Sequence, residues 1–135
     1  MHLSSPIINQ VLSASLTSNS YNVAAHRGKA DFSLQFIYNE SGFGSATLEG
    51  TLALHVSNDP RAHPLKALGN PTEYAAAVWR DITASLPGFP SVVLTGSGND
   101  FYVIENLPVS YIRIGFTYVA GSGSLKVYMT GLGEA

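Results

Sequence analysis

Apolar and polar side chains alternate along most of this chain, and this period of two constrains its fold more than any other feature of the sequence. Successive side chains of a β-strand point to opposite faces, whereas helical side chains return to one face every three or four residues. The pattern therefore predicts strands that are buried on one face. The longest alternating segments are residues 31–38, 46–56, 111–119 and 125–130, and shorter strands are expected at 11–16, 21–25, 92–95 and 101–105.

The long segments are expected to pair as two β-hairpins. One would join residues 31–38 to 46–56 through a connection at 39–44 that contains two glycines. The other would join residues 111–119 to 125–130 through Ala-Gly-Ser-Gly, a turn sequence in which glycine accepts a positive φ. Each hairpin would have one buried face and one semi-polar face.

Strands of this number and spacing predict an all-β fold, an antiparallel β-sandwich or jelly roll of about eight strands. One short helical turn is expected near residues 72–79, where alanines favour a helix and Thr72 is a candidate cap. Three prolines and a glycine in residues 57–74 predict an ordered excursion from the sheets. A single domain is expected over residues 11–135, preceded by an N-terminal arm of residues 1–10 that reaches a neighbouring molecule.

Charge is scarce in this sequence. Charged residues make up 12% of the chain, about half the usual share, while hydrophobic residues make up 45%. Disorder needs the opposite balance, so a folded core is expected. A surface rich in serine, threonine, asparagine and glycine costs little to desolvate against a partner, which favours a protein that assembles with others.

The composition also argues against several classes of function. A net charge of −2 with scattered lysines and arginines disfavours binding to nucleic acid. The sequence contains no cysteine, which excludes disulfides, thiolate metal sites and cysteine nucleophiles. The apolar runs are far shorter than a membrane span and the first residues do not resemble a signal peptide, so no membrane partner is expected.

Recognisable catalytic and metal-binding patterns are missing from the sequence. His55, Asp59 and His63 are spaced four residues apart, but the proline after Asp59 prevents the helix that would align them. Asn58, Asp59 and Asp81 lack the regular spacing of a calcium loop. No nucleophile elbow and no paired carboxylates stand out, so neither an enzyme nor a bound cofactor or metal ion is expected.

Five residues are candidates for an interface or a binding site. Tyr111, Arg113 and Tyr128 fall on the predicted outer face of the second hairpin, where tyrosines beside an arginine suit a protein contact or a sugar platform. The alternative is that the tyrosines line the core or the sheet edges. Trp79 is expected in the core, with a ligand platform as the alternative, and Asp59 would add a polar group from a loop.

Arg113 interrupts a strand that is otherwise rich in isoleucine, phenylalanine and tyrosine. Burying an arginine is costly unless it is paired. Asp81 or Glu105 is the expected partner, and a position in an interface is the alternative.

The end of the chain resembles a known group of proteins. Residues 107–133 contain a proline, a Tyr-Ile-Arg-Ile strand, a glycine-rich turn and a final strand, and they are similar to the end of small β-sandwich virion proteins of tailed bacteriophages. The Ser-Asn-Asp turn at residues 57–59 and the Trp-Arg-Asp-Ile strand at residues 79–82 resemble the middle of those proteins.

This resemblance implies a virion structural protein, either a capsid decoration (cement) protein that stabilises the phage head or another head or tail component. The expected partners are the major capsid protein or another virion protein, together with further copies of this chain, a trimer being favoured. The expected location is the virion, assembled in the host cytoplasm, and no catalytic residue is implied. The alternative is a carbohydrate-binding jelly-roll module on a tail or cell surface that uses Tyr111, Arg113, Trp79 and Asp59.

Overall fold

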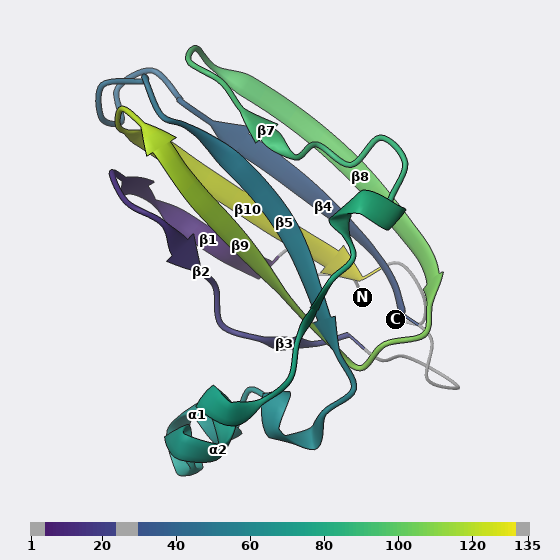
Figure 1. Ribbon diagram of the computed structural model, residues 1–135. Helices are drawn as coiled ribbons and strands as arrows, with labels where there is room; N and C mark the ends of the chain where they lie inside the picture. The colour runs from purple at the N-terminus through teal and green to yellow at the C-terminus, as the bar shows by residue number, and fades with distance from the viewer. Residues whose placement is uncertain (1–4, 24–29, 132–135) are drawn as a thin grey trace.

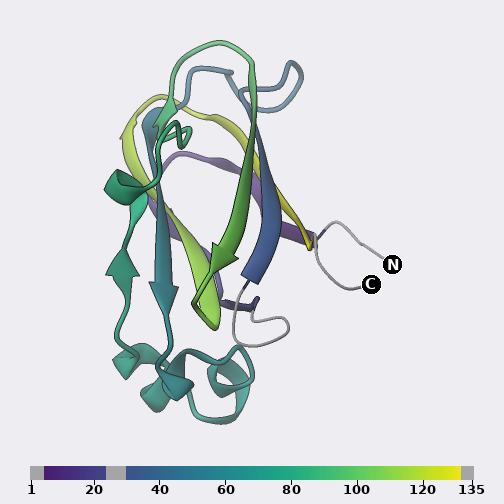
Figure 2. The same ribbon diagram turned by 90° about the vertical axis from the view of Figure 1, so that its right-hand side faces the viewer.

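The computed structural model describes residues 5–23 and 30–131, which form two antiparallel β-sheets packed face to face (Figure 1 and Figure 2). Sheet A contains, in spatial order, β1 (Ser5–Leu12), β10 (Gly123–Gly131), β4 (Ala30–Tyr38) and β8 (Gly98–Leu107). The centre of sheet B consists of β9 (Tyr111–Ala120) and β5 (Glu49–Ser57). Beside β9 lie β2 (Leu16–Thr17) and β3 (Tyr21–Asn22), and beside β5 lie β6 (Arg80–Asp81) and β7 (Val92–Val93).

The chain moves between the two sheets at most of its connections. We count β2 with β3, and β6 with β7, each as one interrupted strand. The order in sheet A is then first, eighth, third and sixth, and the order in sheet B is second, seventh, fourth and fifth. This is the strand order of a jelly roll. The prediction of an all-β sandwich or jelly roll is therefore confirmed.

Neither of the two predicted hairpins forms. β4 and β5 belong to opposite sheets, and so do β9 and β10. Apolar alternation does not distinguish a hairpin from a crossing between sheets, because the inner faces of both sheets contact the same core. At the second crossing Gly121 has a φ of 76°, and a Cβ there would collide with the carbonyl of Thr47, so the tight passage requires glycine.

The core lies between the sheets and consists of aliphatic and phenylalanine side chains from both of them. Fully buried apolar residues include Phe32, Leu34, Phe36, Leu48, Leu54, Val93, Ile112, Ile114, Leu125 and Val127. Phe89, which precedes β7, closes one side of the sandwich. Its ring meets Phe36 at 5.6 Å and Tyr102 at 5.3 Å between ring centres, edge to face in both cases.

Residues 58–79 leave sheet B as an ordered excursion, as predicted, and most of the helical structure lies in it (Figure 1). It contains the 3₁₀ turn η2 (Pro60–Ala62), α1 (Lys66–Gly69) and α2 (Pro71–Ala76). Asn70, not Thr72, caps α2, because Asn70 Oδ1 accepts the N–H of Glu73 at 3.2 Å. The helical segment expected at 72–79 is thus shifted towards the N-terminus. Within the described residues, neither helix is long and apolar enough to cross a bilayer.

Residues 5–10 are part of the sandwich rather than of an arm. They belong to β1, an edge strand of sheet A that pairs with β10. Ile7 and Ile8 are both buried, at an irregularity in the pairing with β10. The prediction of an arm over residues 1–10 is therefore wrong for this part, and residues 1–4 lie outside the described residues.

One buried amide joins the connections at one end of the sandwich. Asn39 follows β4 with a φ of 54° and is 1% exposed. Its Nδ2 donates to the carbonyls of Leu48 (3.0 Å) and Leu94 (2.7 Å), and its Oδ1 accepts the N–H of Leu48 at 2.9 Å. Its backbone N–H donates to the carbonyl of Ser124 at 2.9 Å. A Cβ on Gly123 would collide with Asn39 Oδ1, so the chain packs against this amide without a side chain.

Replacing Asn39 by alanine is expected to lower the free energy of unfolding by about 3 kcal/mol or more, because backbone groups in the core lose their partners. Chemical denaturation measures the change. Asn106→Ala is the matched control, since Asn106 also has a positive φ (57°) but an exposed side chain. That control should lose only about 1 kcal/mol, the cost of a left-handed backbone without asparagine. Equal losses in the two variants would contradict the role of the buried amide.

Candidate functional site

The candidate site lies on the outer face of sheet B, near the end from which the excursion departs (Figure 1). His55 on β5 pairs with Arg113 on β9 on one side and with Asp81 on β6 on the other. Residues directly opposite one another in antiparallel strands share a face of the sheet. An acid, an imidazole and a guanidinium therefore form a row across three strands, which we call the His55 row.

Arg113 is held from two directions. Its Nε donates to Nδ1 of His55 at 3.0 Å, and its guanidinium carbon lies 4.5 Å from the centre of the Trp79 ring, in a cation–π contact. The expected ion pair with Asp81 or Glu105 does not form. Asp81 lies on the far side of His55 in the row, and Glu105 belongs to the other sheet.

His55 is neutral in this arrangement. Burial and the positive charge of Arg113 lower the pKa of His55, while the carboxylate of Asp81 acts to raise it. Because Nδ1 accepts a hydrogen bond, the proton of the neutral ring is on Nε2. Gly115 gives the ring its space, since a Cβ at that position would lie 3.0 Å from His55 Cε1.

Asp59 closes the excursion instead of pointing a free carboxylate at a ligand. It binds the guanidinium of Arg61, with Nη2 and Oδ2 2.8 Å apart, and it accepts the backbone N–H groups of Arg61 and Val78, each at 3.0 Å. These hydrogen bonds, those from the Arg61 side chain foremost, hold the pKa of Asp59 well below its usual range. Because Val78 precedes Trp79, Asp59 also fixes the backbone that presents Trp79 to Arg113.

Two tyrosines tie the excursion to the rest of the domain. The Tyr74 hydroxyl on α2 accepts the N–H of Ser20 at 2.8 Å, and Ser20 Oγ donates to the carbonyl of Ala62 at 2.5 Å. Tyr111 meets the ring of His63 edge to face, with 5.6 Å between ring centres. Tyr111 shares the outer face of β9 with the His55 row, as predicted, but its ring already has a partner within the protein.

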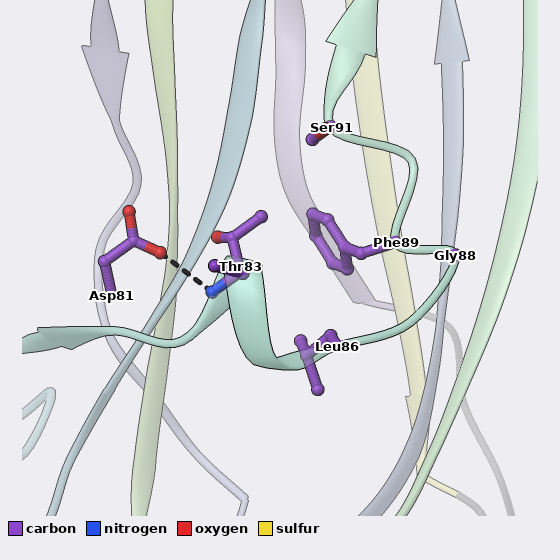
Figure 3. A pocket seen from close by; sticks show the side chains of 7 residues that line it. Asp81, Thr83, Leu86, Gly88, Phe89 and Ser91 are labelled. Atoms are coloured by element: carbon purple, nitrogen blue, oxygen red, sulfur yellow. Dashed lines mark hydrogen bonds between the residues drawn. The ribbon is translucent and has the colours of Figure 1, made fainter.

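An open hollow of about 570 Å³ adjoins the His55 row along the edge of β5 (Figure 3). Its lining consists of Asp81, Thr83, Ala84, Leu86, Gly88, Phe89 and Ser91. Between β6 and β7, β5 has no neighbouring strand on this side among the described residues. There the Thr83 hydroxyl accepts the N–H of Leu54 on β5 at 2.9 Å, a bond that a neighbouring strand would otherwise provide. Asp81 Oδ1 accepts the N–H of Thr83 at 2.9 Å, the dashed line in Figure 3. The pKa of Asp81 is lowered by hydrogen bonding from the side chain of Thr83 first and from its backbone second.

Two of the five candidate residues are placed differently from expectation. Tyr128 lies on β10, opposite Gln35 of β4, on the outer face of sheet A. Its predicted place beside Tyr111 and Arg113 is wrong, because β9 and β10 are in different sheets. Trp79 is not part of the core: it is half-buried and stacks on the Arg113 side chain.

Two contributors to the site were not expected from the sequence. They are Gly115 and His55. From the sequence alone, His55 is considered only as a metal ligand. A glycine and a histidine inside otherwise apolar strands are the available signals, but their meeting depends on the register of β5 against β9. Within residues 5–23 and 30–131, no group of three or more His, Asp or Glu is placed to hold a metal ion.

Comparison of the chain with protein-family models and with curated proteins finds no match. The chemistry of the His55 row is then the most direct guide to what this face can do. A fixed guanidinium beside a neutral imidazole and an indole ring recognises charge and shape.

His55 is expected to make the protein less stable as the pH falls from about 7 to 5. In that interval the unfolded chain takes up a proton near the ordinary histidine pKa of 6.5, whereas the folded state resists protonation. The unfolded state then binds more protons, so the free energy of unfolding falls with falling pH.

Denaturation at a series of pH values measures this slope. His55→Gln, whose amide oxygen still accepts from Arg113, should reduce the slope. His63→Gln removes a different imidazole from the same region and should leave the contribution of His55 in place. A slope that is unchanged in His55→Gln would count against the assignment.

Proposed function

We propose that this protein is a non-catalytic structural component of a virion, a decoration protein that stabilises the head of a tailed phage. It would act by binding further copies of itself, as a trimer, and the major capsid protein. The observation on which the proposal rests is the outer face of sheet A, which combines low charge with exposed apolar side chains.

The most exposed apolar residues of this face are Phe101 on β8, at 62%, Val11 on β1, at 50%, and Val103 on β8, at 47%. Across β4 and β10 the face continues with the neutral side chains Ser33, Gln35, Ile37, Tyr128 and Thr130. Two acids, Asp31 on β4 and Glu105 on β8, lie towards one end of it. At one corner Lys126 is paired with Glu40, with Nζ and Oε1 2.6 Å apart. Such a face gives up little hydration when it is covered, and exposed apolar patches mark contact surfaces.

The edge of sheet A supports self-association. β8 has ten residues, and among the described residues it pairs with β4 and with no other strand. A long exposed edge strand is a template for the addition of another strand. Pairing of two β8 strands with each other would be two-fold and would close a dimer, so in the proposed trimer β8 would add to a different edge of the neighbouring copy.

The fold supports the proposal by analogy. Jelly rolls recur in viral capsid proteins and in lectins, although a fold alone does not determine function. The low share of charged residues, 12%, and the resemblance of residues 107–133 to virion proteins point in the same direction.

The purified protein is expected to form a discrete oligomer, and Phe101→Glu is expected to weaken it at least tenfold, since a charge would enter an apolar contact. Light scattering over a range of concentrations measures both. Thr117→Glu is the matched control, because Thr117 is exposed on the outer face of sheet B. Mass spectrometry of purified phage particles tests the location. A monomer that is missing from the particle would overturn the proposal.

A carbohydrate-binding module is the second candidate, favoured by the position of Trp79, Arg113 and Tyr111 around one face of sheet B. On a glycan array, such a module should give saturable binding that Tyr111→Ala abolishes. Tyr128→Ala, on the other sheet, should bind as well as the unmodified protein. An array with no saturable signal would reject this candidate.

A further inference from the structure

The Arg113 side chain is fixed in place, yet it is not neutralised. Among the described residues, ion pairs form between Arg61 and Asp59, Lys66 and Glu73, and Lys126 and Glu40, and none involves Arg113. Arg113 is the third residue of β9, which has neighbouring strands on both sides, and it is partly buried. Burial disfavours its charge, as the lowered pKa of Arg113 indicates.

We propose that Arg113 anchors a binding site for a carboxylate. Nε is occupied by His55 and one face of the guanidinium is covered by Trp79, which leaves the Nη1 and Nη2 groups to donate. Two N–H groups of a guanidinium match the two oxygens of a carboxylate in a bidentate pair. Because the stacking and the hydrogen bond already hold the side chain, little rotamer freedom is lost when the ligand binds.

The neighbours of Arg113 favour a ligand with a single negative charge. Asp81 stands two strands from Arg113 in the same row, about 10 Å away at the usual strand spacing, and its charge repels a dianionic phosphate more than a carboxylate. His55 adds no second positive charge, because it is neutral. The Cε1–Nε2 edge of its ring packs against Gly115, and the ring carries its proton on Nε2.

A carboxylate can reach this site from two sources, an aspartate or glutamate side chain of a protein against which sheet B packs, or an acidic sugar. Trp79 supplies the readout, because it is the sole tryptophan of the chain and it touches Arg113. Its fluorescence is recorded while the full chain is titrated at constant ionic strength. The probes are acetate, the α-amide of N-acetyl-L-glutamate, in which only the side-chain carboxylate is free, and glucuronate, with chloride as the reference anion.

A saturable change with the carboxylates and none with chloride is the expected result. Tighter binding of the N-acetyl-L-glutamate α-amide than of acetate would assign a protein source, and tighter binding of glucuronate would assign an acidic sugar. Arg113→Lys, which cannot form the bidentate pair, should weaken binding at least tenfold. Arg80→Lys is the matched control, because Arg80 follows Trp79 directly and is exposed, and it should bind like the unmodified protein.

Circular dichroism checks whether Arg113→Lys is folded. If this variant is unfolded, Arg113→Gln is used in its place. The thermal melting temperature of the unmodified protein, which should rise with carboxylate and not with chloride, gives a measurement that needs no variant. The absence of any saturable response to the three carboxylates, or equal binding by Arg113→Lys, would overturn the proposal. Neither result depends on whether the protein is an oligomer or part of a virion.

Discussion

The Asn39 amide is the interaction on which the arrangement of the two sheets depends most. The sheets share no hydrogen-bonded ladder, so their relative position is set by the core and by the connections that cross between them. Two of those connections meet at Asn39, whose side chain pairs with backbone groups of Leu48, in the same connection, and of Leu94, between β7 and β8. Its backbone N–H donates to Ser124 at the start of β10. Without this amide, polar groups would be buried without partners at the point where the chain changes sheets.

The sequence predicted the long strands and their inward faces well, because alternation is a local property that survives any pairing of the strands. The strand expected at residues 11–16 was wrong, since β1 ends at Leu12 and β2 begins at Leu16. It could not predict which strands are neighbours. The apolar pattern is the same whether two consecutive strands form a hairpin in one sheet or cross from one sheet to the other. The glycine-rich turns are also compatible with either arrangement. The error then passed to the candidate site: Tyr128 was assigned to the face of Tyr111 and Arg113, although it belongs to the opposite sheet.

The site shows the same division between local and long-range information. The outward positions of Arg113 and Tyr111 follow from alternation along β9. The partners of Arg113 do not, because Trp79 comes from the end of a 22-residue excursion, residues 58–79, and His55 from a strand that is far away in the sequence. Asp59 illustrates a further limit: a loop acid suggests a ligand, whereas here several nearby N–H groups use its whole carboxylate to close the loop.

The crossing of the chain between sheets also determines how this domain can form. β10 lies between β1 and β4, so sheet A has a gap at its centre until residues 123–131 have been synthesised. Strands so distant in sequence can pair only after a long loop has closed. The entropy lost in closing that loop precedes the favourable contacts, which makes folding slow. A nascent chain on the ribosome therefore exposes the apolar strands β1 and β4 throughout its synthesis. The low charge of the chain suits a surface that is covered in the assembled state. During synthesis, however, it provides little electrostatic repulsion to keep these exposed strands from associating with one another.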